Sequence, residues 1–469
     1  MKKDKPFLGL TRKIEVLIIS LVFALILRGF VLEAFKIPTG SMAPTLRGDH
    51  YFVACSQCGR QFDIGYMAER TRNPNIALPC KCPSCGLVQP VLPIKSGGDR
   101  IIVDKSLYQL RAPERWDVFV FKCPYDPNLN YIKRLIGLPG ETIQFIDGDL
   151  FVNGVIARKP EKVQEELWMP VFDGDLIPAR PKQRGYGRFG WTFPFNENGG
   201  TWTYLHNGRV IECDSDSRAA LEYDSVRGND FSAWYPYNLR TAPEGEVCSD
   251  LRVKFTVAPQ AEGSKLGAKI VKYDREYIGL VDTAAGKLLL MQVIDGVEAV
   301  LGSLDIAPVK TGEPVLFEFN NADYRLEVNF GKYSLSHILG EKPGDIGAQT
   351  ATAPAASILA EGKATLSHIS IFRDLHYITN GVERAAEPFE LGPDDFFACG
   401  DNSQNSYDSR LWNEEGVGNN GITYAAGIVP RDYVFGRAFI VFWPGPMKTK
   451  PTGKSFVPNI GHMRLIYGG

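Results

Sequence analysis

The chain has 469 residues, of which 44% are apolar and 23% charged, and its formal net charge is −2. This length predicts two or three domains, and the composition excludes a largely disordered protein. Lys and Arg do not accumulate outside the N-terminus, so a nucleic-acid partner is not expected. With 47 Gly and 31 Pro among many strand-forming residues, we expect a mainly β fold.

The N-terminus predicts a membrane anchor. A basic segment, residues 1–13, precedes an apolar run that begins at Val16 and reaches the length of a membrane span only if it continues past Arg28. We expect one transmembrane helix over 14–35. The positive-inside rule leaves the basic segment in the cytoplasm and the rest of the chain on the exported side of the cell (inner) membrane.

Two other readings of this segment compete with an anchor. A cleavable secretory signal has the same basic start and apolar core, but it ends in a small-x-small site, and none is evident between Leu27 and Pro38. A buried helix is disfavoured by the basic flank.

A serine motif follows the expected membrane exit. Ser41 lies between Gly40 and Met42, bracketed by Pro38 and Pro44, so a rigid turn is expected to present its hydroxyl. A hydroxyl needs an adjacent base to act as a nucleophile. None of the six His falls in a motif that explains it, and there is no Gly-x-Ser-x-Gly elbow. The sequence therefore disfavours a Ser-His-Asp triad.

Residues 51–97 form a cysteine-rich insert. Two Cys-x-x-Cys knuckles, each followed by Gly, have zinc-ribbon spacing. We expect a structural Zn²⁺ held by Cys55, Cys58, Cys82 and Cys85. Four thiolates close the coordination sphere, which disfavours a catalytic zinc.

The other cysteines leave alternatives open. Cys80 is a spare thiol or a substitute for Cys82. Disulfide pairing within the cluster competes with zinc, because an exported location is oxidising. Cys213 and Cys248 are a candidate disulfide.

Strands are predicted next in the chain, and one of them carries a candidate base. We expect strands at Val118–Phe121 and Tyr131–Ile136, then a hairpin over 142–153. Lys133 lies in the second strand, where burial would lower the pKa of its ammonium enough for it to act as a base. The alternative is that this strand face is exposed and Lys133 points into solvent.

Residues 159–385 are predicted to form an inserted β-rich domain. A polar stretch rich in Gly and Pro is followed, from about 249, by alternating segments such as Arg252–Val257 and Tyr324–Phe330. This pattern predicts a β-sandwich, with an exposed loop at Gly347–Ala356. The later part is similar to concanavalin-like sandwiches, a likeness of fold that names no ligand.

A third polar motif runs from Gly400 to Arg410. It packs small hydroxyls, amides, two carboxylates and an arginine into one turn-like segment. Such a run is often a solvated loop. It can also position a lysine, with Asp408 and Arg410 paired to fix the loop.

Together these segments resemble the type I signal peptidase family. The matching motifs stand in family order: Pro38–Met42, Gly98–Lys105, Tyr131–Gly140, and Gly400–Arg410 with Gly436–Ala438. The resemblance covers about 36–50, 98–158 and 394–445. It implies a catalytic β-domain built from 36–50, 98–158 and 386–446, with residues 447–469 as a C-terminal tail.

The resemblance implies a serine endopeptidase that removes signal peptides from secretory precursors after small-x-small sites. Ser41 would be the nucleophile and Lys133 the general base. The Ser41 N–H and the Thr39 hydroxyl would form the oxyanion hole. Catalysis would need no cofactor, and the partners would be precursor proteins and the lipid bilayer.

The resemblance also assigns supporting roles in the third motif. Ser406 would accept a hydrogen bond from the lysine ammonium, and Asp408 and Arg410 would brace the loop. Ser403 and Gln404 stand where the family often carries Arg and Asp. This departure affects the bracing network more than the serine–lysine pair.

Two other functions remain in view. The self-cleaving repressor peptidases share a Ser-Lys dyad on a similar β-fold, but they lack an anchor. A membrane-tethered binding protein with a degenerate peptidase domain is the non-enzymatic alternative.

Overall fold

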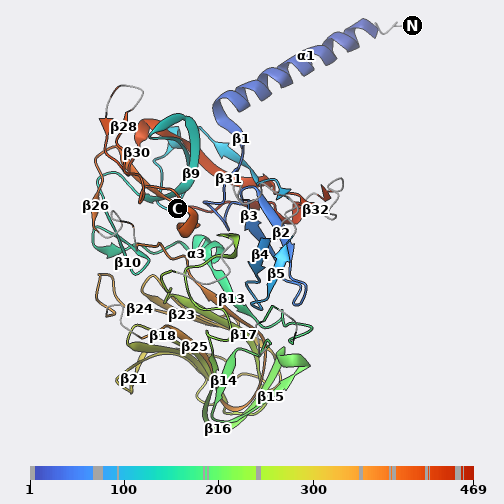
Figure 1. Cartoon of the computed structure of the whole chain (residues 1–469), viewed down its shortest axis with the longest axis vertical. Coiled ribbons are helices and arrows are strands. Elements are labelled where there is room, and N and C mark those ends of the chain that lie inside the picture. Colours follow the sequence, from blue (N-terminus) through green and yellow to red (C-terminus); the bar gives the residue numbers. More distant parts are fainter. Residues whose placement is uncertain are drawn as a thin grey trace.

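The computed structural model describes residues 6–66, 78–91, 95–182, 185–186, 190–238, 245–347, 352–379, 382, 387–417, 421, 423–448, 456–457 and 459–469. The fold is mainly β, as the composition predicts. Figure 1 shows one long N-terminal helix, α1, extending away from the β-sheets.

The N-terminal helix ends earlier than the sequence predicts. Helix α1 spans Pro6–Ile26 and continues as a π-helical turn, Leu27–Val31. Within it, Arg12–Val31 is apolar and long enough to cross a membrane, and its side chains are not buried against the rest of the described chain. The predicted end of the span at residue 35 is wrong, because Leu32–Lys36 form strand β1, whose backbone pairs with a strand of the first sheet.

The first sheet unites the ends and the middle of the chain. Its strands run in the order β1-β7-β31-β8-β9-β27-β30, with β34 paired to β31. Their bounds are β7 Arg100–Asp104, β8 Val118–Cys123, β9 Asp126–Gly137, β27 Asp395–Cys399, β30 Val429–Pro430, β31 Val434–Trp443 and β34 Arg464–Leu465. Both predicted strands before the hairpin are confirmed as β8 and β9.

A four-stranded sheet, ordered β12-β11-β10-β26, follows β9. It consists of β10 (Thr142–Ile146), β11 (Asp149–Val152), β12 (Val155–Ile156) and β26 (Phe389–Glu390). The predicted hairpin is confirmed as β10–β11, in which Ile143 lies opposite Val152. The short helix α2, Leu107–Leu110, lies between β7 and β8.

The cysteine-rich segment forms its own small sheets. Strands β2 (His50–Ala54), β3 (Gln61–Gly65) and β6 (Lys95–Ser96) form one sheet, and β4 (Leu78–Lys81) pairs with β5 (Val88–Val91). The two ends of the segment meet, because the Gly98 N–H donates to Asp49 Oδ1 at 2.9 Å and the Asp99 N–H to the Arg47 carbonyl at 2.8 Å. The segment therefore leaves the first sheet and returns to it at one point.

The large insert is built around one long strand. Strand β25 (Ala355–Arg373) pairs with β13, β16, β17 and β18 in a 13-stranded sheet. The other bounds are β13 Met169–Asp173, β14 Phe195–Asn198, β15 Thr201–Leu205, β16 Val210–Tyr223, β17 Leu251–Pro259, β18 Lys265–Lys272, β19 Arg275–Asp282, β20 Lys287–Ile294, β21 Val297–Asp305, β22 Val315–Ala322, β23 Arg325–Phe330 and β24 Tyr333–Ile338.

The sheet of the insert folds back on itself. Strand β20 contacts β23 and β24, although these lie far apart in the strand order, and one apolar core fills the space between the halves. The alternation predicted for β17 and β23 is confirmed by their burial. Of the predicted loop, Ala355 and Ala356 belong to β25, while 348–351 lie outside the described residues.

Short elements connect these sheets. Helix α3 spans Glu161–Leu167, and a 3₁₀ turn, η4, spans Pro236–Asn238. Two-stranded pairs are formed by β28 (Gly416–Val417) with β29 (Thr423–Tyr424) and by β32 (Met447–Lys448) with β33 (Phe456–Val457).

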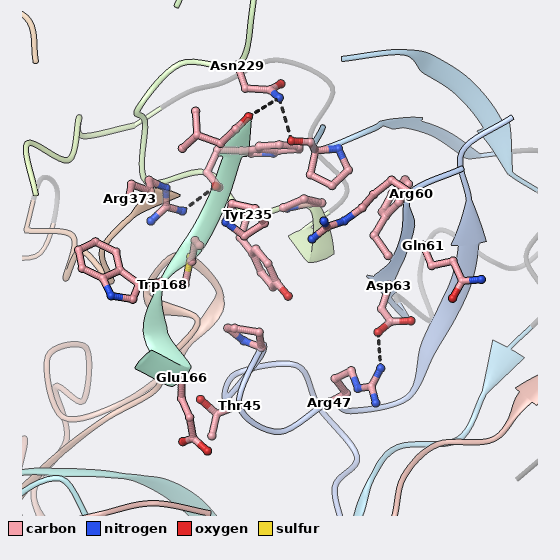
Figure 2. A pocket seen from close by; sticks show the side chains of 18 of the residues that line it. Thr45, Arg47, Arg60, Gln61, Asp63, Glu166, Trp168, Asn229, Tyr235 and Arg373 are labelled. Carbon is pink, nitrogen blue, oxygen red and sulfur yellow. Dashed lines mark hydrogen bonds and ion pairs between the residues drawn. The ribbon is translucent and has the colours of Figure 1, made fainter. Parts of the chain in front are cut away.

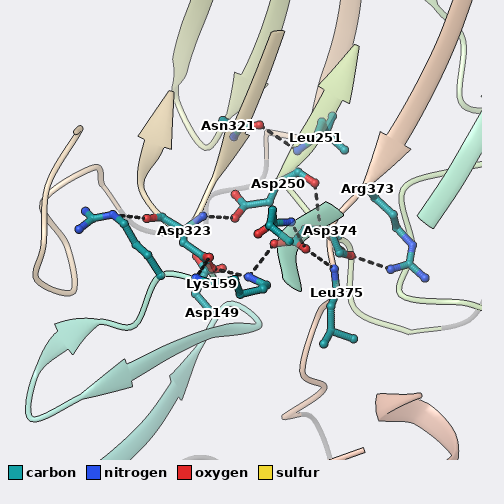
Figure 3. Close-up of polar contacts among 12 residues, drawn as sticks. Asp149, Lys159, Asp250, Leu251, Asn321, Asp323, Arg373, Asp374 and Leu375 are labelled. Carbon is teal, nitrogen blue, oxygen red and sulfur yellow. Dashed lines mark hydrogen bonds and ion pairs between the residues drawn. The ribbon is translucent and has the colours of Figure 1, made fainter. Parts of the chain in front are cut away.

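A buried cluster of charges joins the insert to the four-stranded sheet (Figure 3). Lys272 of β18 bonds to Asp149 of β11 at 3.3 Å and also to Asp250. Lys159 bonds to Asp323 at 2.6 Å and to Asp374 at 2.8 Å. Because the aspartates come from both parts of the chain and the lysines lie between them, the cluster fixes the insert against the rest of the molecule.

Candidate active site

Ser41 lies on a tight turn between β1 and β2. The turn is closed by hydrogen bonds from the Ala43 N–H to the Gly40 carbonyl at 3.1 Å and from the Leu46 N–H to the Met42 carbonyl at 2.8 Å. Met42 and Leu46 are fully buried in a core shared with β7 and β8. Burial of these apolar side chains holds the turn on the sheet and leaves Ser41 at its edge.

Lys133 reaches this serine from strand β9. Its Nζ lies 2.7 Å from Ser41 Oγ, and the exposed fractions of the two residues are 4% and 9%. The alternative in which Lys133 points into solvent is therefore wrong. Burial lowers the pKa of Lys133 to about 8, against the opposing effect of the Asp408 carboxylate. The amine is thus far easier to deprotonate than an exposed lysine.

The third motif contacts the backbone of the serine turn. The Asn402 N–H donates to the Ser41 carbonyl at 3.0 Å, and Asn402 Nδ2 donates to the Gly40 carbonyl at 3.0 Å. Gly400 is required here, because a Cβ at this position would lie 2.3 Å from the Ser41 carbonyl oxygen. The motif is therefore a packed support for the serine turn and not a solvated loop.

Asp408 and Arg410 are paired as expected. Arg410 Nη2 donates to Asp408 Oδ2 at 2.8 Å, and both side chains are buried. Arg410 Nη1 donates to Ser403 Oγ at 2.7 Å. Ser403, which departs from the common family pattern, is therefore itself part of the bracing network, while Gln404 lies beside Gly245 of the insert.

Ser406 does not make its expected contact. It is buried, and its hydroxyl makes no hydrogen bond to Lys133 among the described residues but interacts with the Asp408 carboxylate. The hydroxyl packs beside Gly400, whose missing side chain makes room for it. Thr39 is exposed on the chain next to Gly40, and no structural observation tests its expected role.

Sequence reasoning missed a buried ion pair beside the dyad. Arg134 Nε and Nη2 both donate to the Asp401 carboxylate at 2.7 Å, and both side chains are fully buried. The pair ties the strand that bears Lys133 to the third motif. Its signal was present in the sequence, as an arginine next to Lys133 in an apolar strand and a carboxylate in the motif.

It also missed two residues of the insert. Asn238 exchanges two amide hydrogen bonds with Asn402, at 2.8 and 2.9 Å. Tyr237 packs on Gly40 so closely that a Cβ there would lie 2.0 Å from its ring. Both belong to η4, far from the serine in sequence, and no local pattern marks them.

The four predicted zinc ligands form one cluster. The Sγ atoms of Cys55, Cys58, Cys82 and Cys85 all lie within 4.8 Å of one another. Gly59 and Gly86 adopt positive φ values of 78° and 72°, which lets the backbone turn after each knuckle. Four converging thiols are the donor set of a structural zinc site.

The cysteines outside the four-thiol cluster are buried and unpaired. Cys80 is buried outside the cluster, and burial raises the pKa of its thiol to about 12. All nine cysteines are free, so the candidate Cys213–Cys248 disulfide is not formed. Cys213 packs in the core of the insert, whereas the Cys248 thiol contacts the Asp250 and Asp374 carbonyls.

A pocket of about 430 Å³ is bordered by the serine turn (Figure 2). The turn supplies Pro44 and Thr45, the cysteine-rich segment supplies Arg60 and Gln61, and the insert supplies further walls. Ser41 and Lys133 are not among the lining residues.

Comparison with known proteins points to one family. Residues 89–169 and 350–443 match the family model described as signal peptidase, peptidase S26. Lys133 and the third motif fall inside the matched residues, and Ser41 precedes them. The unmatched residues between the two segments lie within the large insert.

Curated relatives carry the same description. Signal peptidase I of Pseudomonas fluorescens is 36% identical over 149 residues, which are 31% of this chain and 37% of the relative. Signal peptidase I of Rickettsia bellii (strain OSU 85-389) is 33% identical over 153 residues, 32% of this chain and 42% of the relative. The chain thus spans less than half the length of these relatives.

The solved structures that align with this chain are only distantly similar to it. The carbohydrate-binding module CBM66 from Bacillus subtilis aligns over 38% of this chain and 95% of its own length. The identity is 11% and the TM-score 0.27, too low to support a shared fold or ligand.

Proposed function

We propose that this chain, whose residues 89–169 and 350–443 match the family model described as signal peptidase, peptidase S26, is a membrane-anchored serine endopeptidase that removes signal peptides from exported precursors. The substrates would carry small residues at the two pocket-filling positions before the cut. One observation carries the proposal: a buried lysine amine with a lowered pKa lies 2.7 Å from a serine hydroxyl on a fixed turn.

In the proposed mechanism, neutral Lys133 accepts the proton of the Ser41 hydroxyl as Oγ attacks the scissile carbonyl. The resulting oxyanion accepts hydrogen bonds from the Ser41 N–H and the Thr39 hydroxyl. Protonated Lys133 then gives its proton to the departing amine. In the second half of the reaction, a water molecule attacks the acyl-enzyme and the same amine accepts the proton of that water.

The contacts of the third motif support this mechanism. Hydrogen bonds from Asn402 to the Gly40 and Ser41 carbonyls restrain the serine turn, and the Asp408–Arg410 pair restrains Asn402's own loop. Such restraint favours a reactive geometry, because attack requires the nucleophile at a fixed distance and angle.

We also propose a topology and a metal. Residues 14–31, within the apolar helical segment Arg12–Val31, would cross the inner membrane once, with residues 1–13 in the cytoplasm and the sheets on the exported side. Cys55, Cys58, Cys82 and Cys85 would hold a structural Zn²⁺. The catalytic β-domain would comprise 36–50, 98–158 and 386–446, the zinc ribbon 51–97 and the inserted domain 159–385.

The test is cleavage of a synthetic precursor peptide with an Ala-x-Ala site by the detergent-solubilised full chain. Mass spectrometry should find one cut after the second Ala, and Ser41→Ala and Lys133→Ala should each abolish it. Circular dichroism confirms that both variants fold. A folded but inert wild type would instead favour the tethered binding protein.

A further inference from the structure

The pocket bordered by the serine turn has no role in the mechanism proposed above. Its walls come from three parts of the chain: the turn itself, strand β3 of the cysteine-rich segment, and the segments of the insert around β13 and η4. Pro44 and Thr45 in its wall are three and four residues from Ser41, so they lie within about 14 Å of it along the chain. Five residues of an extended peptide span that distance.

Hydrogen-bond donors in this pocket lack partners. Arg47 Nη2, Arg60 Nε and Trp234 Nε1 are buried and have no hydrogen-bond partner in the part of the chain that the structure describes. Figure 2 shows Arg60 reaching across the pocket toward Tyr235. Three acceptors of the lining also lack hydrogen-bond partners among the described residues, namely Asp63 Oδ1, Glu166 Oε2 and Asn229 Oδ1. Buried polar atoms are nearly always paired in native proteins, so this grouping indicates a ligand that both accepts and donates hydrogen bonds, as a peptide with a polar side chain does.

The lining carries more cations than carboxylates, with Arg47, Arg60, Arg373 and Arg464 against Asp63, Glu166 and Asp230. Arg373 is 3% exposed, and its guanidinium donates to the Asp374 and Trp234 carbonyls, with no ion pair to a carboxylate among the described residues. Arg60 has only a long contact of 3.4 Å with Asp173. A buried cation without a full counter-charge attracts an anion, and a carboxylate suits a guanidinium best.

The apolar part of the wall favours a peptide as the carrier of that anion. The same cavity is lined by the apolar side chains of Phe62, Trp168, Met169 and Val171. A peptide with a carboxylate side chain and apolar neighbours could therefore place its charge against the arginines and its apolar groups against this part of the wall.

The position of the pocket decides which part of a precursor can reach it. Figure 1 shows β3 and β13 on the side of the first sheet away from α1. If α1 lies in the membrane, this side faces water, where the mature part of a precursor is found.

We propose that this pocket binds an acidic side chain of the precursor in the segment that follows the scissile bond. The inference rests on the proposed function, and it makes the insert part of substrate recognition. Precursors with a suitably placed Asp or Glu would then be processed at lower concentration than others.

The experiment uses peptides with one cleavage site and a single Glu placed in turn at each of the positions three to eight after the cut, with Gln as the matched residue. For the full chain, Glu at one or two of these positions should lower KM about tenfold relative to Gln. The Arg60→Gln enzyme should lose that difference, and so should Gln61→Trp, which fills the pocket from an exposed position.

Arg218→Gln is the control, because Arg218 is an arginine of the insert outside the pocket; it should keep the Glu–Gln difference. Equal KM values for Glu and Gln at every position, or a difference that persists in Arg60→Gln, would overturn the inference while leaving peptide cleavage established. A wild type that cleaves none of the peptides would instead count against the proposed function.

Discussion

Lys133 differs from an ordinary lysine because of where strand β9 places it. The side chain is enclosed by the first sheet and the third motif, and loss of water lowers its pKa more than nearby carboxylates raise it. Asp408, the carboxylate that most raises the pKa of Lys133, is already bonded to Arg410. Pairing that carboxylate with an arginine limits its ability to hold the lysine in the charged form.

Asn238 is expected to position the serine turn through Asn402. Asn238→Ala removes both amide bonds to Asn402, so the turn should lose part of its restraint. We expect kcat to fall about tenfold while KM and the pH midpoint stay unchanged, because the base is untouched. Steady-state kinetics across pH would measure this.

Asn198→Ala is the matched control, since Asn198 is an exposed asparagine of the same insert. It should leave kcat unchanged. If Asn238→Ala raised KM alone, or shifted the pH midpoint, the residue would not act by positioning the turn.

Local sequence was enough to single out the serine and lysine, and the four cysteines, that the structure brings together. Ser41, Lys133 and the four clustered cysteines each stand in a short motif. Tyr237 and Asn238 could not be found, because Tyr237 packs on Gly40, almost 200 residues earlier, and Asn238 bonds to Asn402, 164 residues later. The wrong expectation for Ser406 has a similar origin, since its hydroxyl orientation depends on packing against Gly400.

At the scale of elements, the two cysteine knuckles support a specific metal prediction. Metal analysis of the purified full chain should find one zinc per chain, and a strong chelator should lower the melting temperature. Cys82→Ser should lose the metal. Cys80→Ser is the control and should retain it, because Cys80 lies outside the thiol cluster. A metal-free protein with an unchanged melting temperature in chelator would refute the zinc site.

The end of the N-terminal apolar helix could not be located from hydropathy. Residues 32–35 continue the apolar run, but they have partners in β7, with Leu32 opposite Asp104. Whether such a segment continues a membrane helix or forms a strand depends on whether a partner strand is available. Here the partner strand, β7, begins 64 residues after β1 ends. Hydropathy alone therefore placed the boundary too late.

At the scale of the whole molecule, the buried charge cluster holds the insert in place. Lys272→Met leaves Asp149 and Asp250 without their cation in a buried site. We expect the free energy of unfolding to fall by about 3 kcal/mol near pH 8. Chemical denaturation would measure this change.

The same variant should lose less stability near pH 5. Burial and the neighbouring Asp250 raise the pKa of Asp149, so the carboxyl is more readily protonated in the folded state, and a neutral carboxyl needs no cation. Lys287→Met removes an exposed ion pair of the insert and should change stability by less than about 0.5 kcal/mol. Equal effects of the two substitutions would show that the cluster does not stabilise the junction.

The arrangement of the large parts was predictable from the order of motifs, because family-like segments at both ends and the middle had to meet in one domain. The orientation of the insert was not. It depends on long-range pairs such as Lys272 with Asp149 and Asn238 with Asn402, which no periodicity records. The insert thereby reaches the serine turn, a contact that sequence order alone does not indicate.

The most direct test of the account is the pH dependence of kcat/KM for peptide cleavage by the wild-type chain. Only the neutral amine of Lys133 can accept the Ser41 proton, so activity should rise with pH and reach half its maximum near pH 8, the pKa that burial gives this lysine. Below the midpoint the rate should fall about tenfold per pH unit. A profile that is flat between pH 6 and 10, or a midpoint at the value of an exposed lysine, would contradict the serine–lysine mechanism.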